Sequence, residues 1–390
     1  MENKTCKLKD KCGACQLLHL TYPKTIEYKK KYVIDSFKNE GINVNIDKVI
    51  DAKSPYQYRN KMIIAFQNHK GKVISGFYEE NSHKIIDLDN CIMHSDIQNK
   101  IANFIKKLII DFHVSIYDED RRTGLLRYVL IREAVHTKEV LITFVLSDDI
   151  FPSSKEIIRR ITNEFKEVKA VIQNVNNRKT SIVLGDKEKV LYGRPYIEDE
   201  LMGLKFKITS KSFYQVNPIQ VEYLYKEAIN SIKCKGDETV IDAYSGIGTI
   251  GLILSKNVGK VISVEQNRQA YLAAIQNAKD NNIKNVYFEN DDATKFIKEL
   301  ENEKIDYVIM DPPRTGSTPQ FLNSVLKLSP RGVVYVSCDP QTLARDVKVL
   351  LKSYKIEHIS IVDMFCFTKH IESVCLLTNR TGNTKCNLDM

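Results

Sequence analysis

The sequence contains no long apolar run. No eighteen consecutive apolar residues occur among its 390 residues, so it predicts no membrane-spanning helix and no membrane partner. Residues 1–20 are rich in lysine and lack the apolar core of a secretory signal, so we expect a cytoplasmic protein. Internal repeats and low-complexity linkers are also missing, and no feature indicates an obligate protein partner. The length instead predicts two domains, or one domain with a large extension.

The composition is that of a globular protein with a basic excess. Hydrophobic residues make up 43% of the sequence, which is sufficient for buried cores. The 58 basic and 49 acidic residues give a net charge of +9. A basic excess is compatible with a phosphate backbone as partner, although a lysine run is also typical of a solvated face. Nine cysteines without a signal segment indicate thiols or metal ligands rather than disulfides.

The second half of the sequence alternates short β-branched runs with amphipathic stretches. We predict seven strands, at residues 239–243, 260–264, 286–288, 307–310, 333–336, 359–362 and 374–377. Helical patterns lie between them, for example at residues 266–279 and 340–351. This order predicts an α/β fold with a doubly wound, mostly parallel seven-stranded sheet, in which ligands bind at the carboxyl ends of the strands.

The first half is mixed. It has a helical pattern at residues 22–38 and predicted strands at residues 62–66, 72–77, 128–132, 140–146 and 170–174. We therefore expect an α+β domain at residues 1–205, followed by the parallel α/β domain at residues 206–390. The boundary follows the break at Gly193 and Pro195.

A glycine-rich loop follows the first predicted strand of the second half. The segment DAYSGIGTIG at residues 242–251 lets the backbone approach a ligand closely, and the helix that it opens offers free N–H groups. Glu265 ends the next strand, where its carboxylate is suited to the two hydroxyls of a ribose. This loop is compatible with S-adenosylmethionine, with a dinucleotide or with a structural turn. Asp242, four residues before Gly246, favours S-adenosylmethionine.

Two further strands end in reactive side chains. Asp311 begins the segment DPPR, whose two prolines make a rigid turn at a strand tip, although a plain turn with a solvated carboxylate has the same pattern. Cys338 lies between a strand and a helix that begins near Pro340, a position that favours the thiolate. A thiolate that adds to carbon 6 of uracil makes carbon 5 nucleophilic, and a base must later remove the carbon 5 proton. Glu372 is the candidate base and His370 the alternative.

Three cysteines near the N-terminus have the spacing C-x5-C-x2-C. They are Cys6, Cys12 and Cys15, and Cys91 follows much later. Four thiolates of this kind are compatible with a [4Fe–4S] cluster and with zinc, and structural cysteines without a metal remain a third interpretation.

Five segments together resemble the uracil-C5 RNA methyltransferase family, whose members make 5-methyluridine in tRNA and rRNA. The matching segments are SFYQVNP at 212–218, DAYSGIG at 242–248, DPPR at 311–314, SCDP at 337–340 and HIE at 370–372. They occur in the order typical of the family and cover most of residues 210–378.

The resemblance implies a reaction, a cofactor and residue roles. Cys338 would be the nucleophile and Glu372 the base, with S-adenosyl-L-methionine as methyl donor. The residues expected to bind this cofactor are Gln215, Tyr244, Gly246, Glu265 and Asp311, with Asp292 at its adenine end.

The cysteine pattern resembles the rRNA branch of the family. By that resemblance Cys6, Cys12, Cys15 and Cys91 would bind a [4Fe–4S] cluster, and the substrate would be a flipped-out or loop uridine of 23S rRNA. Many members of this branch carry a small RNA-binding barrel before the cysteines. This chain starts five residues before Cys6, so we expect a member that lacks the barrel.

Basic and aromatic residues that are suited to grip RNA occur at residues 56–61 and 121–122 and at Arg127 and Arg132, although each group is also typical of a solvated face. The same reaction on tRNA is the first alternative function. A nicotinamide-dependent oxidoreductase and a non-catalytic RNA-binding protein are the others, and neither explains Cys338 together with Glu372.

Overall fold

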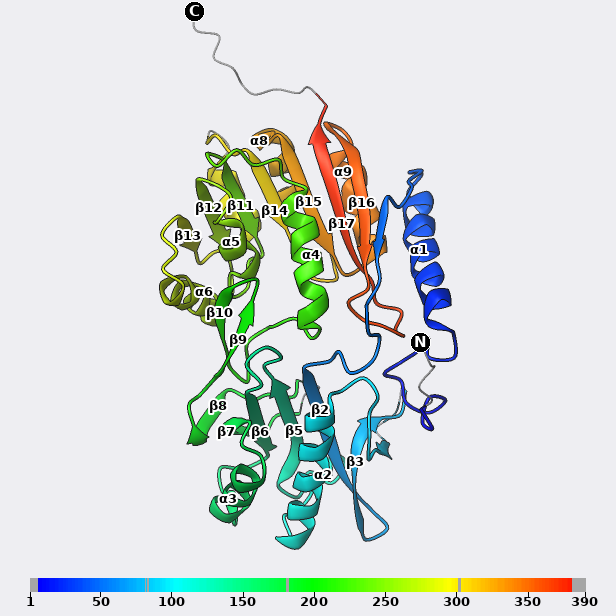
Figure 1. The fold of residues 1–390 in the computed structure, drawn as a ribbon, viewed down its shortest axis with the longest axis vertical. Coiled ribbons are helices and arrows are strands. Elements are labelled where there is room, and N and C mark those ends of the chain that lie inside the picture. Colours follow the sequence, from blue (N-terminus) through cyan, green and yellow to red (C-terminus); the bar gives the residue numbers. More distant parts are fainter. Residues whose placement is uncertain (1–5, 81, 83, 180–181, 301–302, 381–390) are drawn as a thin grey trace, which may run out of the picture. The chain divides into compact units, whose positions relative to one another are not determined.

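The computed structural model describes residues 6–80, 82, 84–179, 182–300 and 303–380 (Figure 1). The chain forms two compact units, and each consists of two stretches of sequence. The N-terminal unit contains Met1–Thr21 and Ser54–Pro218, and the C-terminal unit contains Tyr22–Lys53 and Ile219–Met390. The sequence predicts a single boundary between residues 205 and 206. The observed division differs from it because an early segment of about thirty residues folds with the second half.

The C-terminal unit is built on a sheet of eight strands within the described residues. Their order is β1-β16-β17-β15-β14-β11-β12-β13. The strands are β1 (Lys48–Ile50), β11 (Thr239–Ala243), β12 (Lys260–Val264), β13 (Val286–Glu289), β14 (Tyr307–Met310), β15 (Gly332–Ser337), β16 (Tyr354–Val362) and β17 (Glu372–Asn379). Strand β17 is antiparallel to both of its neighbours, and all other neighbouring pairs are parallel.

The number of strands corrects the prediction of seven. All seven predicted strands are present, and β1 adds an eighth beside β16, with Lys48 opposite Ser360. Three residues of β1 carry too little pattern to be recognised as a strand in the sequence. Their place in the sheet depends on a partner more than three hundred residues away.

Helices cover both faces of this sheet. The helices are α1 (Tyr22–Asn39), α4 (Pro218–Asn230), α5 (Thr249–Leu254), α6 (Arg268–Asp280), α7 (Ala293–Glu299), α8 (Pro319–Leu328) and α9 (Pro340–Leu350). Apolar residues of α1, α7, α8 and α9 share one buried core with the sheet, while α4 crosses the other face (Figure 1). Strands β14 and β15 are therefore buried along their whole length, as is typical of a parallel sheet covered on both sides.

Helix α1 is fixed to the C-terminal unit by a buried ion pair. Lys29 Nζ lies 2.6 Å from Asp363 Oδ1, and neither side chain is exposed. The same ammonium group donates to the Phe365 carbonyl at 2.9 Å, and the Tyr22 hydroxyl donates to Asp363 Oδ2 at 2.8 Å. The segment between β16 and β17 is therefore held against α1 by charged and neutral hydrogen bonds together.

The N-terminal unit is α+β, as the sequence predicts. Its main sheet has the order β4-β3-β2-β5-β6-β7-β8, and only β6 and β7 pair in parallel. These strands are β2 (Lys61–His69), β3 (Lys72–Tyr78), β4 (Ile85–Asp87), β5 (Leu126–Glu133), β6 (Val140–Leu146), β7 (Val168–Val175) and β8 (Lys187–Gly193). A separate hairpin is formed by β9 (Ile197–Leu201) and β10 (Leu204–Ile208).

Two helices, α2 (Asp96–Asp111) and α3 (Ser154–Glu164), belong to this unit and lie next to each other. Helix α2 begins with a capping box in which Ser95 and Gln98 each accept the backbone N–H of the other, and it buries Ile101, Ile105 and Leu108. In the described part of the chain, none of the helices has the length and apolar character needed to cross a bilayer.

Candidate active site

The glycine loop is held against the end of strand β11 by Asp242. The carboxylate of Asp242 is buried and accepts the Gly251 N–H at 2.9 Å and the Ser263 hydroxyl at 3.4 Å. A Cβ at Gly251 would lie 2.6 Å from Ser263 Oγ and 2.7 Å from Asp242 Oδ2, so only glycine lets α5 approach this closely. Burial raises the pKa of Asp242 to about 7. Asp242 therefore holds the glycine loop in place through these two hydrogen bonds.

Glu265 is joined to the same loop. One carboxylate oxygen accepts the Gly246 N–H at 2.8 Å, and the other accepts the Asn267 N–H at 2.6 Å. The Gly246 backbone has a φ of +57°, a conformation that glycine adopts readily. The structure thus brings together Gly246 and Glu265, two of the residues that the sequence assigns to the cofactor.

Tyr244 is positioned by residues that the sequence analysis missed. Its φ is +63°, and its hydroxyl is hydrogen-bonded to Ser317 Oγ at 2.9 Å. Asp346 Oδ2 accepts the Ser317 N–H and the Tyr335 hydroxyl, each at 2.7 Å. No sequence motif indicates this network, because its members come from different loops and elements.

Asp292, which the sequence analysis expects at the adenine end of the cofactor, caps a helix. Its Oδ1 accepts the backbone N–H of Thr294 at 2.9 Å and of Lys295 at 3.2 Å, so it is the N-cap of α7. Its charge also raises the pKa of Tyr244, although burial of Tyr244 is the larger cause. Asp292 and Tyr244 are therefore close enough to belong to one site.

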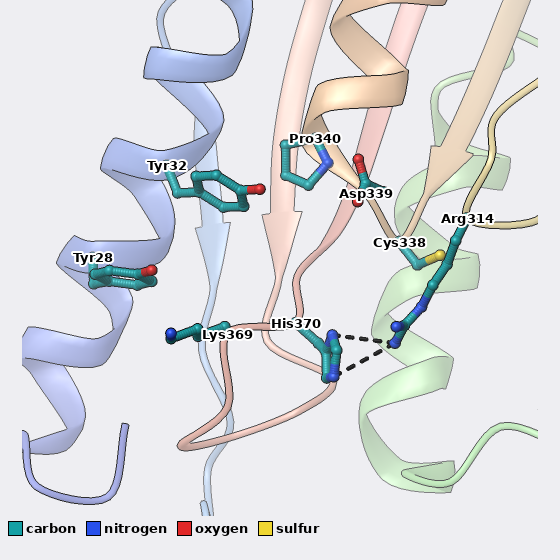
Figure 2. Close-up of a pocket in the computed structure, with 8 residues that line it drawn as sticks. All are labelled: Tyr28, Tyr32, Arg314, Cys338, Asp339, Pro340, Lys369 and His370. Carbon is teal, nitrogen blue, oxygen red and sulfur yellow. Dashed lines mark hydrogen bonds between the residues drawn. The ribbon is translucent and has the colours of Figure 1, made fainter. Parts of the chain in front are cut away.

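Cys338 lies between the end of β15 and the start of α9, as the sequence predicts. It lines a pocket of about 280 Å³ in the C-terminal unit, which Figure 2 shows. The residues that line this pocket are Tyr28, Tyr32, Arg314, Cys338, Asp339, Pro340, Lys369 and His370. The sulfur is thus placed beside a cavity rather than inside the apolar core.

The acidity of Cys338 differs from the prediction. Burial, together with the charges of Glu372 and Asp311, raises the pKa of the Cys338 thiol to about 11, and only Arg314 among nearby side chains acts in the opposite direction. The N-terminus of α9 is capped by Asp339, whose Oδ1 accepts two N–H groups of the first turn at 3.0 Å each. The helix N-terminus therefore does not make the thiolate the favoured form in this structure.

Asp311 and Glu372 are two carboxyl groups, each with a pKa above the usual range. Glu372 is 3% exposed, and burial followed by the charge of Asp311 raises its pKa well above the usual range. Burial raises the pKa of Asp311 to about 7. A carboxyl group that titrates near neutral pH is suited to general acid–base chemistry.

Arg314 and His370 meet at the pocket. Arg314 Nη2 lies 3.1 Å from His370 Nδ1, and Figure 2 shows the two side chains converging below Cys338. The charge of Arg314 lowers the pKa of both Cys338 and Glu372. The pocket is therefore lined by a thiol, an imidazole and a guanidinium group, and two carboxyl groups lie close enough to affect them. Such groups are suited to nucleophilic addition and proton removal.

Gln215 belongs to the N-terminal unit, unlike the other predicted site residues of the cofactor and of catalysis. Its carbonyl accepts a hydrogen bond from Asn60 Nδ2 at 3.1 Å within that unit.

The four predicted metal cysteines also lie in the N-terminal unit. The pKa of Cys15 is raised to about 12, mainly by burial and further by the charges of Cys91, Cys12 and Cys6. The charges of the other three cysteines thus affect the Cys15 thiol. Within the described residues, however, no group of three or more histidine, cysteine, aspartate or glutamate side chains is arranged to hold a metal ion.

Two of the basic residues offered for RNA binding have structural roles instead. Arg127 is 3% exposed, pairs with Glu119 at 2.8 Å and donates to the Asn176 carbonyl at 2.8 Å. Arg132 is 6% exposed and donates to the carbonyls of Ser210 and Ser212. Sequence shows only that a residue is basic, whereas these guanidinium groups satisfy buried carbonyl groups.

Comparison with known proteins identifies the family of this chain. A family model described as tRNA (Uracil-5-)-methyltransferase matches residues 21–380. An uncharacterised RNA methyltransferase of Clostridium tetani is 42% identical over 377 residues, covering 96% of this chain and 82% of the relative. Another from Clostridium acetobutylicum is 41% identical over 379 residues, covering 95% and 82%.

A solved structure is similar along nearly the whole chain. It is the Pyrococcus abyssi tRNA (uracil-54, C5)-methyltransferase in complex with S-adenosyl-L-homocysteine, with a TM-score of 0.80 and 28% sequence identity. The alignment covers 96% of this chain and 87% of the other. Because the family model and the relatives extend over almost all of the sequence, this protein is an RNA methyltransferase that belongs to the tRNA (uracil-5-)-methyltransferase family.

Proposed function

We propose that this protein methylates carbon 5 of a specific uridine in 23S rRNA, with S-adenosyl-L-methionine as methyl donor. The observation that carries the proposal is Cys338, whose thiol lines a pocket and shares its electrostatic environment with Glu372, Asp311 and Arg314. Such a site has a nucleophile for carbon 6 and a base for the carbon 5 proton.

Cys338 begins the reaction by adding to uracil. Once the thiol has lost its proton, sulfur bonds to carbon 6, and the electrons of the C5–C6 double bond move toward the O4 oxygen as an enolate. Arg314 stabilises the negative charge on sulfur, since it lowers the pKa of the thiol. Carbon 5 is then nucleophilic and takes the methyl group.

Glu372 completes the reaction as the base. Its carboxylate accepts the proton from carbon 5, the C5–C6 double bond re-forms, and the bond from carbon 6 to sulfur breaks. One proton is released for each methyl group transferred, and Cys338 is regenerated. The buried position of Glu372 makes its carboxylate a stronger base than an exposed glutamate, because burial raises its pKa.

The methyl donor supplies an electrophilic methyl group on a sulfonium. We propose that Tyr244, Gly246, Glu265, Asp292 and Asp311 hold it. These residues fit S-adenosyl-L-methionine. Glu265 and Asp292 are carboxylates near the glycine loop, and Asp311 is an acidic side chain, which suits a cationic ligand. The similar P. abyssi structure is a complex with S-adenosyl-L-homocysteine, which supports the choice of cofactor by similarity.

The choice of 23S rRNA rests on the cysteine pattern, and tRNA is the second candidate. The solved relative is named as a tRNA enzyme, which favours tRNA by similarity. We further propose that Cys6, Cys12, Cys15 and Cys91 hold a [4Fe–4S] cluster, because the C-x5-C-x2-C spacing with a distant fourth cysteine is typical of such sites. No reaction step passes through the cluster. Either RNA would place the protein in the cytoplasm.

The cluster has its own test. Protein purified without air should be brown and contain about four iron and four sulfide ions per chain. A colourless protein with one zinc ion would refute the cluster while leaving the methylation proposal intact.

A methyl-transfer assay tests the reaction and the substrate. Unmodified 23S rRNA and tRNA transcripts are incubated with the protein and labelled S-adenosyl-L-methionine, then digested to nucleosides. Label in 5-methyluridine from rRNA is the expected result, whereas label only in tRNA would keep the mechanism and change the substrate.

The Cys338→Ala variant tests the nucleophile: it should abolish turnover and still bind the methyl donor. Methylation by that variant would overturn the role of Cys338.

A further inference from the structure

Two tyrosines of helix α1 line the pocket that contains Cys338. Tyr28 and Tyr32 are one helical turn apart, and their rings lie 6.5 Å apart at an angle of 25° between planes. Tyr28 is 39% exposed. Figure 2 shows both side chains on the pocket-facing side of α1, with the Tyr32 ring directed toward Pro340 and Tyr28 on the side of Lys369. The pocket therefore has a reactive side with Cys338 and an aromatic side from a distant part of the sequence.

Core packing accounts for only one of these rings, because Tyr32 is partly buried and packs against the apolar core, whereas Tyr28 is exposed. Helix α1 buries another face, which includes Val33 and Phe37. Tyr28 remains in water, and its neighbours at helical spacing on the exposed side are Lys24 and Lys31. A tyrosine flanked by lysines on a helix surface is compatible with a solvated face, but that interpretation does not explain why both rings line a cavity.

Cations complete the aromatic side of the pocket. Lys369 is exposed and lies in the segment between β16 and β17, and Arg314 lies deeper, beside Cys338. Lys24 and Lys31 on α1 add positive charge beside Tyr28, while the carboxylate of Asp339 lies on the Tyr32 side of the pocket. Aromatic rings that stack on bases, together with cations that attract phosphates, are the combination by which proteins hold single-stranded RNA.

We propose that Tyr28 and Tyr32 form a stacking surface for a base adjacent to the target uridine, and that Lys369 contacts the phosphate that joins the two nucleotides. This inference rests on the proposed function, since it takes Cys338 as the point where the target uracil binds. It adds that the substrate strand must be unpaired beside the target as well as at the target. A base that remained in a duplex would not present its face to the rings.

The surface is fixed before RNA arrives. Lys29, next to Tyr28 in the sequence, forms the buried ion pair with Asp363 at 2.6 Å. Asp363 begins the segment that leads to Lys369, so one interaction positions both sides of the proposed base site. A preorganised surface of this kind lowers the entropic cost of ordering an RNA loop.

Paired substitutions separate stacking from other roles. Tyr28→Ala/Tyr32→Ala removes both rings, whereas Tyr28→Phe/Tyr32→Phe retains them without the hydroxyls. Tyr287→Ala in β13 is the control, because Tyr287 is 54% exposed and does not line this pocket. The RNA is the transcript that the wild-type protein methylates. For the alanine pair we expect KM for RNA to rise about 5- to 100-fold, with KM for the methyl donor unchanged. The phenylalanine pair and the control should remain within about twofold of the wild type.

A fluorescent base tests the contact directly. 2-Aminopurine is placed in the RNA next to the target uridine, and its fluorescence should fall when the wild-type protein or the phenylalanine pair binds. The alanine pair should not quench it. Equal KM and equal quenching in the alanine pair would refute the stacking surface while wild-type methylation upheld the proposed function. A rise only in KM for the methyl donor would assign the rings to the cofactor instead. Lack of methylation by the wild type with either RNA would refute the proposed function itself, and the stacking surface with it.

Discussion

The ion pair between Lys29 and Asp363 provides a test of how α1 is held in the C-terminal unit. Both side chains are fully buried, and their charged atoms lie 2.6 Å apart. Lys29→Met retains most of the aliphatic stem and removes the ammonium group. The Asp363 carboxylate would then remain buried with the Tyr22 hydroxyl as its remaining side-chain donor among these residues, and the Phe365 carbonyl would lose the hydrogen bond from Lys29.

The expected loss of stability is large for one substitution. Removing one partner of a buried ion pair typically costs about 3–5 kcal/mol, because the other charge stays buried without compensation. The C-terminal unit has about 200 residues, for which about 4 kcal/mol corresponds to a fall in Tm of roughly 10 °C. Adding Asp363→Asn should recover at least half of this loss, since asparagine is neutral and its oxygen still accepts from Tyr22.

An exposed pair serves as the matched control. Lys348 and Glu40 lie 3.0 Å apart, with side-chain exposures of 57% and 33%. Lys348→Met should cost less than about 1 kcal/mol, because water already solvates both charges. Thermal unfolding followed by circular dichroism measures all of these variants. If Lys29→Met unfolded within 2 °C of the wild type, the buried pair would not be what fixes α1, and the argument for a preorganised pocket would fail.

Three further predictions concern the glycine loop and the reactive cysteine. Gly251→Ala should lower the free energy of unfolding by about 1–3 kcal/mol in urea titrations, because the new Cβ would lie 2.6 Å from Ser263 Oγ; an unchanged midpoint would contradict this packing. Burial raises the pKa of Asp242 from 3.8 to about 7, so between these pH values the folded protein holds a proton that the unfolded chain has lost, and the free energy of unfolding should fall as pH rises from 4 to 7. Asp242→Asn should flatten this dependence in urea titrations at several pH values, and an equally steep profile would assign it to other groups. Because Arg314 lowers the pKa of Cys338, Arg314→Met should shift the pH profile of methylation to higher pH and reduce the rate at pH 7 about tenfold; a superimposable profile would exclude Arg314 from stabilising the thiolate.

Local sequence determined the strands and the placement of motifs. The β-branched runs that end in Ala243, Val264, Met310 and Ser337 are buried strands of one sheet, because parallel strands covered on both faces are apolar along their length. Motifs placed directly after such strands necessarily lie at one edge of the sheet. The relation between Cys338 and the glycine loop was therefore predictable before any coordinates were known.

Tertiary structure decided the features that depend on residues distant in the chain. Strand β1 exists through its pairing with β16, and Tyr28 lines the pocket of Cys338 because Lys29 pairs with a residue 334 positions away. Burial raises the pKa of Cys338, and the charge of Glu372 raises it further; the position of Glu372 follows from the pairing of β17 with β15. Local patterns record which side chains are apolar, charged or reactive. Burial and the distances between charges, which set acidity and fix α1, arise only when the chain is folded.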